Sequence, residues 1–336
     1  MEKSLQEKTR ILIKISGNSI SDSYTTIAIP ENWSRIQKKY KTIIYILEST
    51  SRAFINSIFL VGIIFSIFRW SKHKFSAKAF WFSFLFLFSL SIIMKINVFP
   101  QAIGLFSIQE SIKSQMLMFF INNSAELFFK VFSISLIIGA IYKDTEAKRF
   151  KKNITTILTG LFCGIIVMGF ALIVSSFEFK LAPQWGAIYS LGAYSSFLSQ
   201  LTNKMLIFIN RFILFYLFII FGNTIIKNDK TQKTFILLSI LLGITSIGSL
   251  GINNITLWIL HGIILGIIFY CLYLYFLKFD SSFIILYLAG GTSLSIIEQG
   301  IIGGYSGLLI QSFIISIIIL ILSIIFFLRI NIQLKN

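Results

Sequence analysis

FLKFDSSFIILYLAGGTSLSIIEQGIIGGYSGLLI, at residues 276–310, shows what kind of protein this chain is. This stretch holds a short apolar segment, residues 283–298, whose last residue is the acidic Glu298. It also holds the densest glycine cluster of the chain. Glycine permits both a helix break and the close approach of two backbones, while a carboxylate at membrane depth is costly. We therefore expect either a broken or re-entrant segment with Glu298 at its centre, or tight helix packing beside an outer-loop carboxylate.

The composition of the whole chain indicates a membrane protein. Of the 336 residues, 56% are hydrophobic and 13% are charged, whereas a soluble domain carries about 25% charged residues. Apolar runs of about 20 residues, the length that crosses a bilayer as a helix, recur along the chain. The predicted fold class is all-α: a polytopic transmembrane helix bundle of about nine spans. The expected spans are residues 53–68, 79–98, 116–142, 154–176, 205–226, 234–252, 255–277, 283–298 and 305–328.

The net charge of +17 is distributed as in a membrane protein. Links rich in Lys and Arg alternate with poor ones: four in residues 69–78, one in 99–115, five in 143–153 and two in 177–204. Cytoplasmic loops carry the excess of basic residues, so we expect a cell-membrane protein with a cytoplasmic C-terminus. The many Ile, Lys, Asn and Phe residues suggest a bacterial inner membrane. A nucleic-acid interface would need a basic face on a soluble domain, so the lipid bilayer, and no nucleic acid, is the expected partner.

Three regions are predicted: a polar N-terminal segment at 1–41, a single transmembrane domain at 42–330 and a short cytoplasmic tail at 331–336. Nine spans would place the N-terminus outside. Residues 1–52, however, carry nine Lys and Arg and no apolar leader segment, which disfavours export. Two explanations stand: this segment stays in the cytoplasm and one span is miscounted, or Met1 begins partway through what was once a longer chain.

Ionisable residues at membrane depth are the candidates for function. Glu126 and Lys130 are four residues apart and, with Asn122, fall on one face of a helix. They indicate either a solute or proton path in which Glu126 titrates, or a buried pair that locks helix packing. An Arg inside a span would seek a carboxylate as its partner. The predicted intramembrane polar site comprises Glu126, Lys130, Arg211, His261 and Glu298.

Neither a metal nor a cofactor is predicted, and an enzyme is not expected. A zinc site normally needs three or more ligands from His, Cys, Asp and Glu. The only histidine besides His261 is His73, which lies in a basic link. The motifs GxxxxGK[ST], GxSxG and HExxH are absent from the sequence. No catalytic residue is therefore assigned.

Several short stretches carry a resemblance to a known family: IPENWSR at 29–35, INVFPQAIGLFSIQES at 96–111, APQWGAIYSLGAYSSFLSQL at 182–201, LKFDSSFIILYLA at 277–289 and GGYSG at 303–307. In this order they resemble the non-catalytic multi-spanning region of large bacterial CPBP-type (CAAX protease and bacteriocin-processing) intramembrane protease proteins. The resemblance implies a membrane scaffold without its protease.

The family's catalytic motifs, EExxxR, FxxxH and HxxxN, are missing. Position four before His73 is Arg69 and position four after His261 is Leu265. No catalytic residue of the family can therefore be carried over to this chain.

Three functions are compatible with these observations. The first is a non-catalytic membrane scaffold or partner-binding module related to CPBP-type protease proteins, with a membrane protein as its partner. The second is a secondary transporter of a small solute or proton, with Glu126 and Glu298 on its path. The third is an intramembrane metalloprotease. The first is expected because no complete catalytic motif is present.

Overall fold

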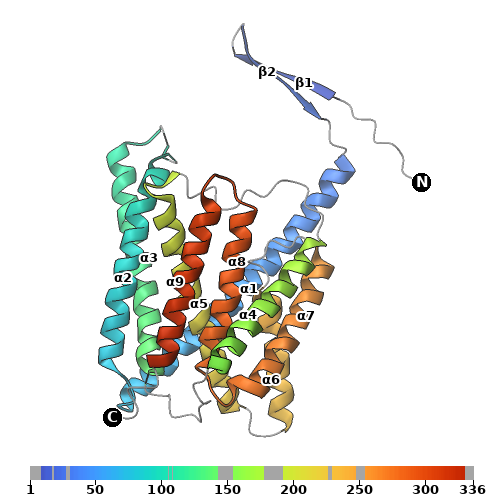
Figure 1. The fold of residues 1–336 in the computed structure, drawn as a ribbon. Coiled ribbons are helices and arrows are strands. Elements are labelled where there is room, and N and C mark those ends of the chain that lie inside the picture. Colours follow the sequence, from blue (N-terminus) through green and yellow to red (C-terminus); the bar gives the residue numbers. More distant parts are fainter. Residues whose placement is uncertain are drawn as a thin grey trace, which may run out of the picture. The chain divides into compact units, whose positions relative to one another are not determined.

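The computed structural model describes residues 9–16, 19–27, 31–104, 106–107, 109–142, 154–177, 192–225, 229–246 and 254–329. In these residues a β-hairpin precedes nine α-helices (Figure 1). The chain divides into two compact units, Met1–Thr50 and Ser51–Asn336, and the predicted boundary after residue 41 falls inside the first helix. The helices are α1 (Glu31–Ser71), α2 (Ala77–Gly104), α3 (Ile112–Ile141), α4 (Ile154–Ser176), α5 (Ser196–Ile225), α6 (Asp229–Ser246), α7 (Ile255–Leu272) with the π-helical turn η3 (Tyr273–Leu277), α8 (Phe283–Ile301) and α9 (Leu308–Arg329).

The N-terminal unit contains the hairpin, which the sequence analysis did not predict. Strand β1 (Thr9–Ser16) pairs antiparallel with β2 (Ser19–Ile27), and Ile13 faces Ser23 across the pair. Isoleucines alternate with other residues along β1, and β2 is rich in Thr and Ser. The period of two and the β-branched side chains favour a strand. The register shifts between Lys14 and Ile15, close to the turn.

Among the residues that the structure describes, eight helices are long and apolar enough to cross a membrane, which confirms the predicted all-α polytopic fold. By helix length and hydropathy the chain is a multi-pass integral membrane protein. The apolar part of α6, Gln232–Thr245, is shorter than these spans. The apolar run at residues 283–298 is short for a span and predicts a segment that could be broken or re-entrant. In the structure α8 is a continuous helix of 19 residues that includes Glu298.

The chain turns at alternate ends of the helices. In Figure 1 the α2–α3 and α8–α9 turns lie at one end of the bundle, and the α1–α2 turn lies at the other. The α1–α2 turn contains Lys72 and Lys74, whereas residues 302–307 between α8 and α9 contain no Lys or Arg. This arrangement agrees with the alternation of basic and non-basic links. Which end faces the cytoplasm stays a prediction.

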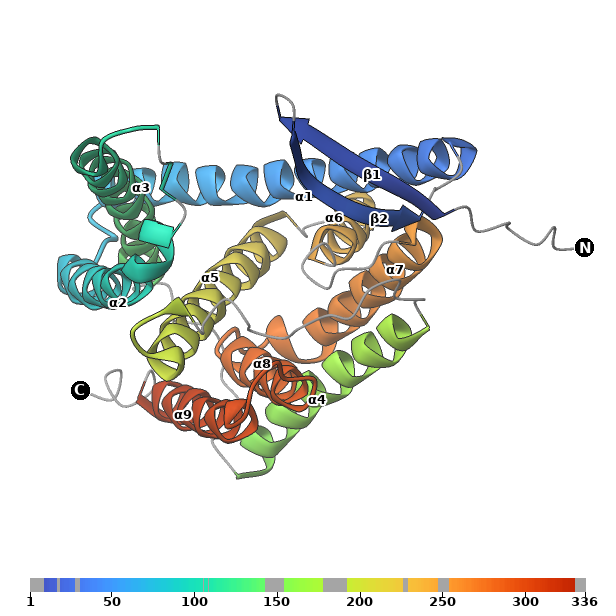
Figure 2. The ribbon, with the colours of Figure 1, turned by 90° about the horizontal axis from the view of Figure 1, so that it is seen from above.

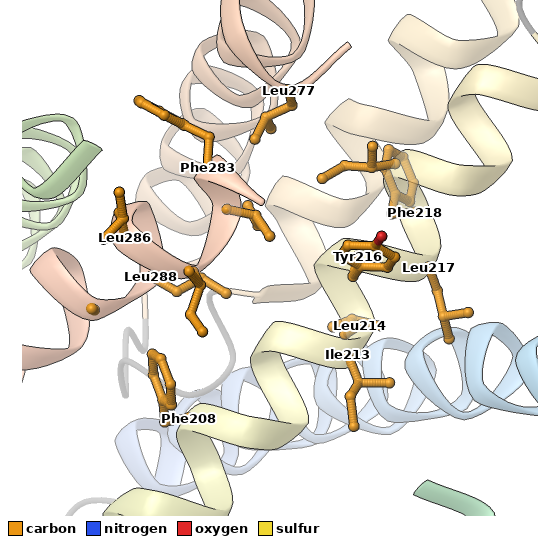
Figure 3. Close-up of a cluster of buried hydrophobic side chains, with 14 of the residues drawn as sticks. Phe208, Ile213, Leu214, Tyr216, Leu217, Phe218, Leu277, Phe283, Leu286 and Leu288 are labelled. Carbon is orange, nitrogen blue, oxygen red and sulfur yellow. The ribbon is translucent and has the colours of Figure 1, made fainter. Parts of the chain in front are cut away.

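Helix α5 is the centre of the helical unit. It contacts α2, α3, α6, α8 and α9, and Figure 2 shows it between the α2–α3 pair and the other helices. The part of α5 that follows Arg211 is apolar and largely buried, and Ile213 and Leu217 are 0% exposed there. Figure 3 shows that this cluster of buried side chains includes residues of α5, such as Ile213 and Leu217, and residues of α8, such as Phe283 and Leu286. The buried core therefore follows the length of α5 and the first half of α8.

Helices α4 and α8 approach so closely that backbone meets backbone. A Cβ atom added at Gly164 would lie 1.9 Å from the carbonyl oxygen of Tyr287, and one at Gly290 would lie 2.2 Å from that of Leu161. Small residues permit such approach in lipid, where the hydrophobic effect does not drive helices together. Gly290 and Gly291 of α8 thus pack against α4, Gly300 packs against Ser312 of α9, and none of the three breaks the helix.

We predict that Gly164→Ala destabilises the protein by about 1–3 kcal/mol or more, because the added methyl group overlaps backbone atoms that cannot rotate away. The measurement is the thermal unfolding midpoint in detergent. The control is Gly169→Ala on the same helix, where the nearest atom to the new Cβ, Leu294 Cδ2, lies 3.8 Å away. Equal effects of the two substitutions would contradict the close crossing.

Candidate functional sites

Polar side chains line one face of the central helix α5. Ser196, Gln200 and Lys204 follow one another at intervals of four residues, and Arg211 falls on the same face because each residue turns the helix by about 100°. The helix begins at Ser196 because the preceding residue, Ser195, accepts a hydrogen bond from the backbone N–H of Leu198 at 3.3 Å. A hydroxyl in this position caps a helix N-terminus.

The first part of this face belongs to a hydrogen-bonded chain that joins α5 to α9. Gln200 Nε2 donates to the Tyr305 hydroxyl at 2.5 Å, and that hydroxyl donates to Gln311 Oε1 at 3.0 Å. Gln311 Nε2 then donates to Ser196 Oγ at 3.2 Å. Gln200 is only 2% exposed, so its amide depends on a protein partner. We call these four residues the Gln200 network.

One turn further along α5, charged residues meet inside the bundle. Lys204 Nζ donates a hydrogen bond to Gln299 Oε1 of α8. Glu298 and Arg211 both act electrostatically on Lys204, and Arg211 also acts on Tyr287. Two predicted site residues, Arg211 and Glu298, are thus brought to one cluster by a third residue. The cluster thus holds three charged residues and two polar ones from α5 and α8: Lys204, Arg211, Glu298, Gln299 and Tyr287.

Lys204 was not among the predicted site residues. The sequence analysis placed it in the link 177–204, because the apolar run of this span starts after it. The structure extends α5 back to Ser196, so Lys204 lies inside the helix. The spacing of Ser196, Gln200 and Lys204 at four-residue intervals was the signal that could have identified a polar helical face.

A second polar stripe lies on the outside of α3. Asn122, Glu126 and Lys130 are all exposed. Within the part of the chain that the structure describes, no hydrogen bond or ion pair joins any of them to another residue. The structure therefore does not show the buried Glu126–Lys130 pair that was one of the two expectations. It shows opposite charges on a face that no described helix covers.

The neighbouring residue on α3 has a different environment. Asn123 accepts a hydrogen bond from Lys95 Nζ of α2 through its side-chain oxygen. Its side-chain amide donates to the backbone oxygen of Phe119 at 2.7 Å. Asn123 is therefore satisfied within the protein, whereas the stripe has no hydrogen-bond partner among the described residues.

His261, on α7, stands apart from both groups. Its side chain is 0% exposed and lies beside Phe170 of α4, with ring centroids 6.2 Å apart. Neither ring nitrogen has a hydrogen-bond partner in the described residues. Nowhere in those residues do three His, Cys, Asp or Glu side chains gather as a metal site requires. The five predicted residues thus occupy three separate places.

We predict that Lys204 and Gln299 are energetically coupled. Gln299→Leu removes the oxygen that accepts from the Lys204 ammonium, and a buried donor without its acceptor costs about 1–3 kcal/mol. Lys204→Met removes the charge together with that need. The double variant should therefore lose less unfolding free energy than the sum of the two single losses, by about 1 kcal/mol or more. Additive effects in the double-mutant cycle would contradict the bond.

Comparison with known proteins adds no assignment: no family model, no curated protein and no solved structure matches this chain. The resemblance to CPBP-type proteins therefore rests on the short stretches quoted above and stays a prediction.

Proposed function

We propose that this multi-pass membrane protein is a non-catalytic partner-binding module that docks a membrane helix of another polypeptide against α3. One observation carries the proposal: Glu126 and Lys130 are exposed near the middle of a membrane-spanning helix. Helix α3 runs from Ile112 to Ile141 and has 30 residues, so Glu126 lies at its midpoint and Lys130 one turn beyond.

Lipid is a poor environment for such a pair. A charged side chain at the centre of a membrane helix costs about 2.5–3.5 kcal/mol on insertion scales, and such residues normally face a bundle interior and pair with each other. The long Lys130 side chain can reach toward the headgroups, but the shorter Glu126 side chain cannot cover about half of a 30 Å core. A partner helix that offers hydrogen bonds to both groups removes this cost.

The surroundings of the stripe suit a helix–helix contact. Ala125 and Phe129 are also exposed on this side of α3. A small residue lets a second helix approach, and an aromatic ring adds contact area. The partner is therefore a transmembrane helix with a polar or charged residue near its midpoint. A CPBP-type intramembrane protease is the partner class that the sequence resemblance suggests.

We predict that a photo-crosslinking amino acid at Phe129 forms adducts with a polypeptide in the membranes in which the protein is naturally made. The matched control is Ile166 of α4, because Phe129 and Ile166 are 68% and 67% exposed and both lie near the middle of a span. Adducts should form at position 129 only and should disappear when Glu126 and Lys130 are both replaced by Leu. Lipid adducts alone at both positions would contradict the proposal.

A second candidate function is secondary transport of a small solute or proton. The observation that favours it is the cluster of Lys204, Arg211, Glu298 and Gln299 within the bundle, since ionisable residues inside membrane proteins often mark ion and proton paths. The polar face of α5 extends from Ser196 at the helix start to Arg211 deep in the span. In this function Glu298 is the residue that takes up and releases a proton.

For this second function we predict that Glu298→Gln abolishes proton flux into liposomes that contain the purified protein. A pH gradient drives the flux and an enclosed pH-sensitive dye reports it. Glu126→Gln makes the same chemical change at an exposed position outside the cluster and should leave the flux unchanged. Equal flux in wild type and Glu298→Gln, or no flux with the wild type, would reject this function.

A further inference from the structure

The first three turns of α1 concentrate positive charge. Residues 31–42, here called the basic segment, contain one acidic residue, Glu31. They also contain four basic residues: Arg35, Lys38, Lys39 and Lys41. The net charge of the basic segment is therefore +3, the difference between four positive charges and one negative charge. Basic residues clustered directly before a membrane span are typical of segments that contact the charged surface of a bilayer.

The length of α1 shows that part of the helix lies outside the hydrocarbon of the membrane. The helix has 41 residues, which corresponds to about 60 Å along its axis. About 20 residues are enough to cross a hydrocarbon core of about 30 Å. The basic segment is the part of α1 that lipid would exclude most strongly, because charged side chains are costly inside the core.

The residues that follow place the basic segment next to the headgroups. Residues 43–47 are all apolar, and Tyr45 and Ile46 are exposed. Tyrosine favours the boundary between membrane and water. Lys38 and Lys41 precede this apolar run by five and two residues, which corresponds to about 7.5 and 3 Å along the helix. Both distances lie within the Debye length of about 8 Å at physiological ionic strength, so the charge of the headgroups acts on both ammonium groups.

The lysines of the basic segment are available to a partner from outside the chain. The guanidinium of Arg35 is paired with Glu31 at 2.7 Å. Lys38, Lys39 and Lys41 are exposed, and their ammonium groups form no hydrogen bond or ion pair with any residue that the structure describes. Three positive charges thus stand on one short stretch of helix without a protein partner in the described part of the chain.

The basic segment also has an apolar side. Ile36 and Tyr40 lie one turn apart on it, and each is about half exposed. Helical spacing puts Lys38 and Lys41 on the opposite side and Lys39 at the flank. A helix with this distribution rests in the membrane interface, with its apolar side toward the acyl chains and its lysine ammonium groups among the headgroups.

We propose that the basic segment of α1 binds the headgroups of anionic phospholipids at the membrane surface. The chemical group it recognises is the lipid phosphodiester, because a lysine ammonium is a compact charge with three hydrogen-bond donors. Each lysine beside an anionic bilayer contributes about fivefold to binding, so three together contribute about a hundredfold. This contact goes beyond the partner proposed for α3 and does not depend on it.

The accessibility of the apolar side tests the inference. The full-length protein without Cys163 and Cys271 carries a fluorescent dye at Ile36→Cys and is placed in lipid nanodiscs. In nanodiscs that contain phosphatidylglycerol, a quencher attached to the acyl chains should reach the dye, and acrylamide in the water should not. In nanodiscs of phosphatidylcholine alone, and at high salt, the dye should become accessible to acrylamide because the electrostatic attraction is lost or screened.

Charge variants connect this effect to the lysines. Replacing all three by glutamine, in Lys38→Gln/Lys39→Gln/Lys41→Gln, should lower the ratio of lipid-facing to water-facing dye about a hundredfold in phosphatidylglycerol nanodiscs. The variant Lys38→Arg/Lys39→Arg/Lys41→Arg keeps the charge and should keep the ratio of the wild type. Loss of the lipid contact in both variants would overturn the inference, because the charge would not be its cause.

The matched control removes the same charge elsewhere in the chain. Lys72, Lys74 and Lys78, in and next to the α1–α2 turn, are exposed as well, and their replacement by glutamine should leave the ratio unchanged. Inorganic phosphate should displace the segment no more than sodium chloride of equal ionic strength does. Equal accessibility with and without phosphatidylglycerol, an equal loss in the control variant, or stronger displacement by inorganic phosphate would overturn the assignment to lipid.

Discussion

A polar group inside a bilayer has no water to bond, so it needs a partner within its own helix, in another helix or in another molecule. The simplest partner is the backbone of the same helix: Ser66 Oγ donates to the Gly62 carbonyl at 2.7 Å, and Ser239 Oγ donates to that of Phe235 at 2.9 Å. Longer polar side chains cannot be satisfied in this way. Lys204 instead reaches Gln299 on α8, and Gln200 reaches Tyr305 in the turn before α9, whose hydroxyl donates to Gln311 of α9. This requirement ties α8 and α9 to α5.

Helix packing in lipid depends on close fit, and here glycine provides it twice. Besides the α4–α8 crossing, α6 and α7 meet at Gly243, where an added Cβ would lie 2.2 Å from the carbonyl oxygen of Gly262. Trp258 of α7 adds a hydrogen bond from its indole N–H to the Ile244 carbonyl of α6 at 2.9 Å. The short helix α6 thus has a dense contact with α7, although its apolar part is shorter than the other spans.

Hydropathy predicted the spans because twenty apolar residues leave few alternatives to a membrane helix. It missed the true start of α5, since Ser196–Lys204 is polar and its stability comes from residues far away in the sequence. Asn97 of α2 is one of them: its side chain accepts from the backbone N–H of Ser195 and donates to the carbonyl of the same residue, both at 2.9 Å. The candidate residues were predicted by type, but their grouping depends on helix rotation, which spacing within one helix does not determine.

The same kinds of residue therefore occupy two opposite environments in this protein. Lys204 and Glu298 lie among polar partners of α5 and α8, where the hydrogen bond from Lys204 to Gln299 connects the two helices and Glu298 acts electrostatically on Lys204. Glu126 and Lys130 are exposed and precede the stretch of α3, Val131 to Ile141, that holds its buried residues. The residues of α3 that are buried in the core, such as Ile134 and Ile137, come after the stripe in the chain, so a helix that docks on the stripe need not disturb the interior cluster. The interior cluster and the exposed stripe are thus separate in the chain, and the proposed docking predicts that a substitution at Glu126 affects partner binding while one at Glu298 acts within the bundle.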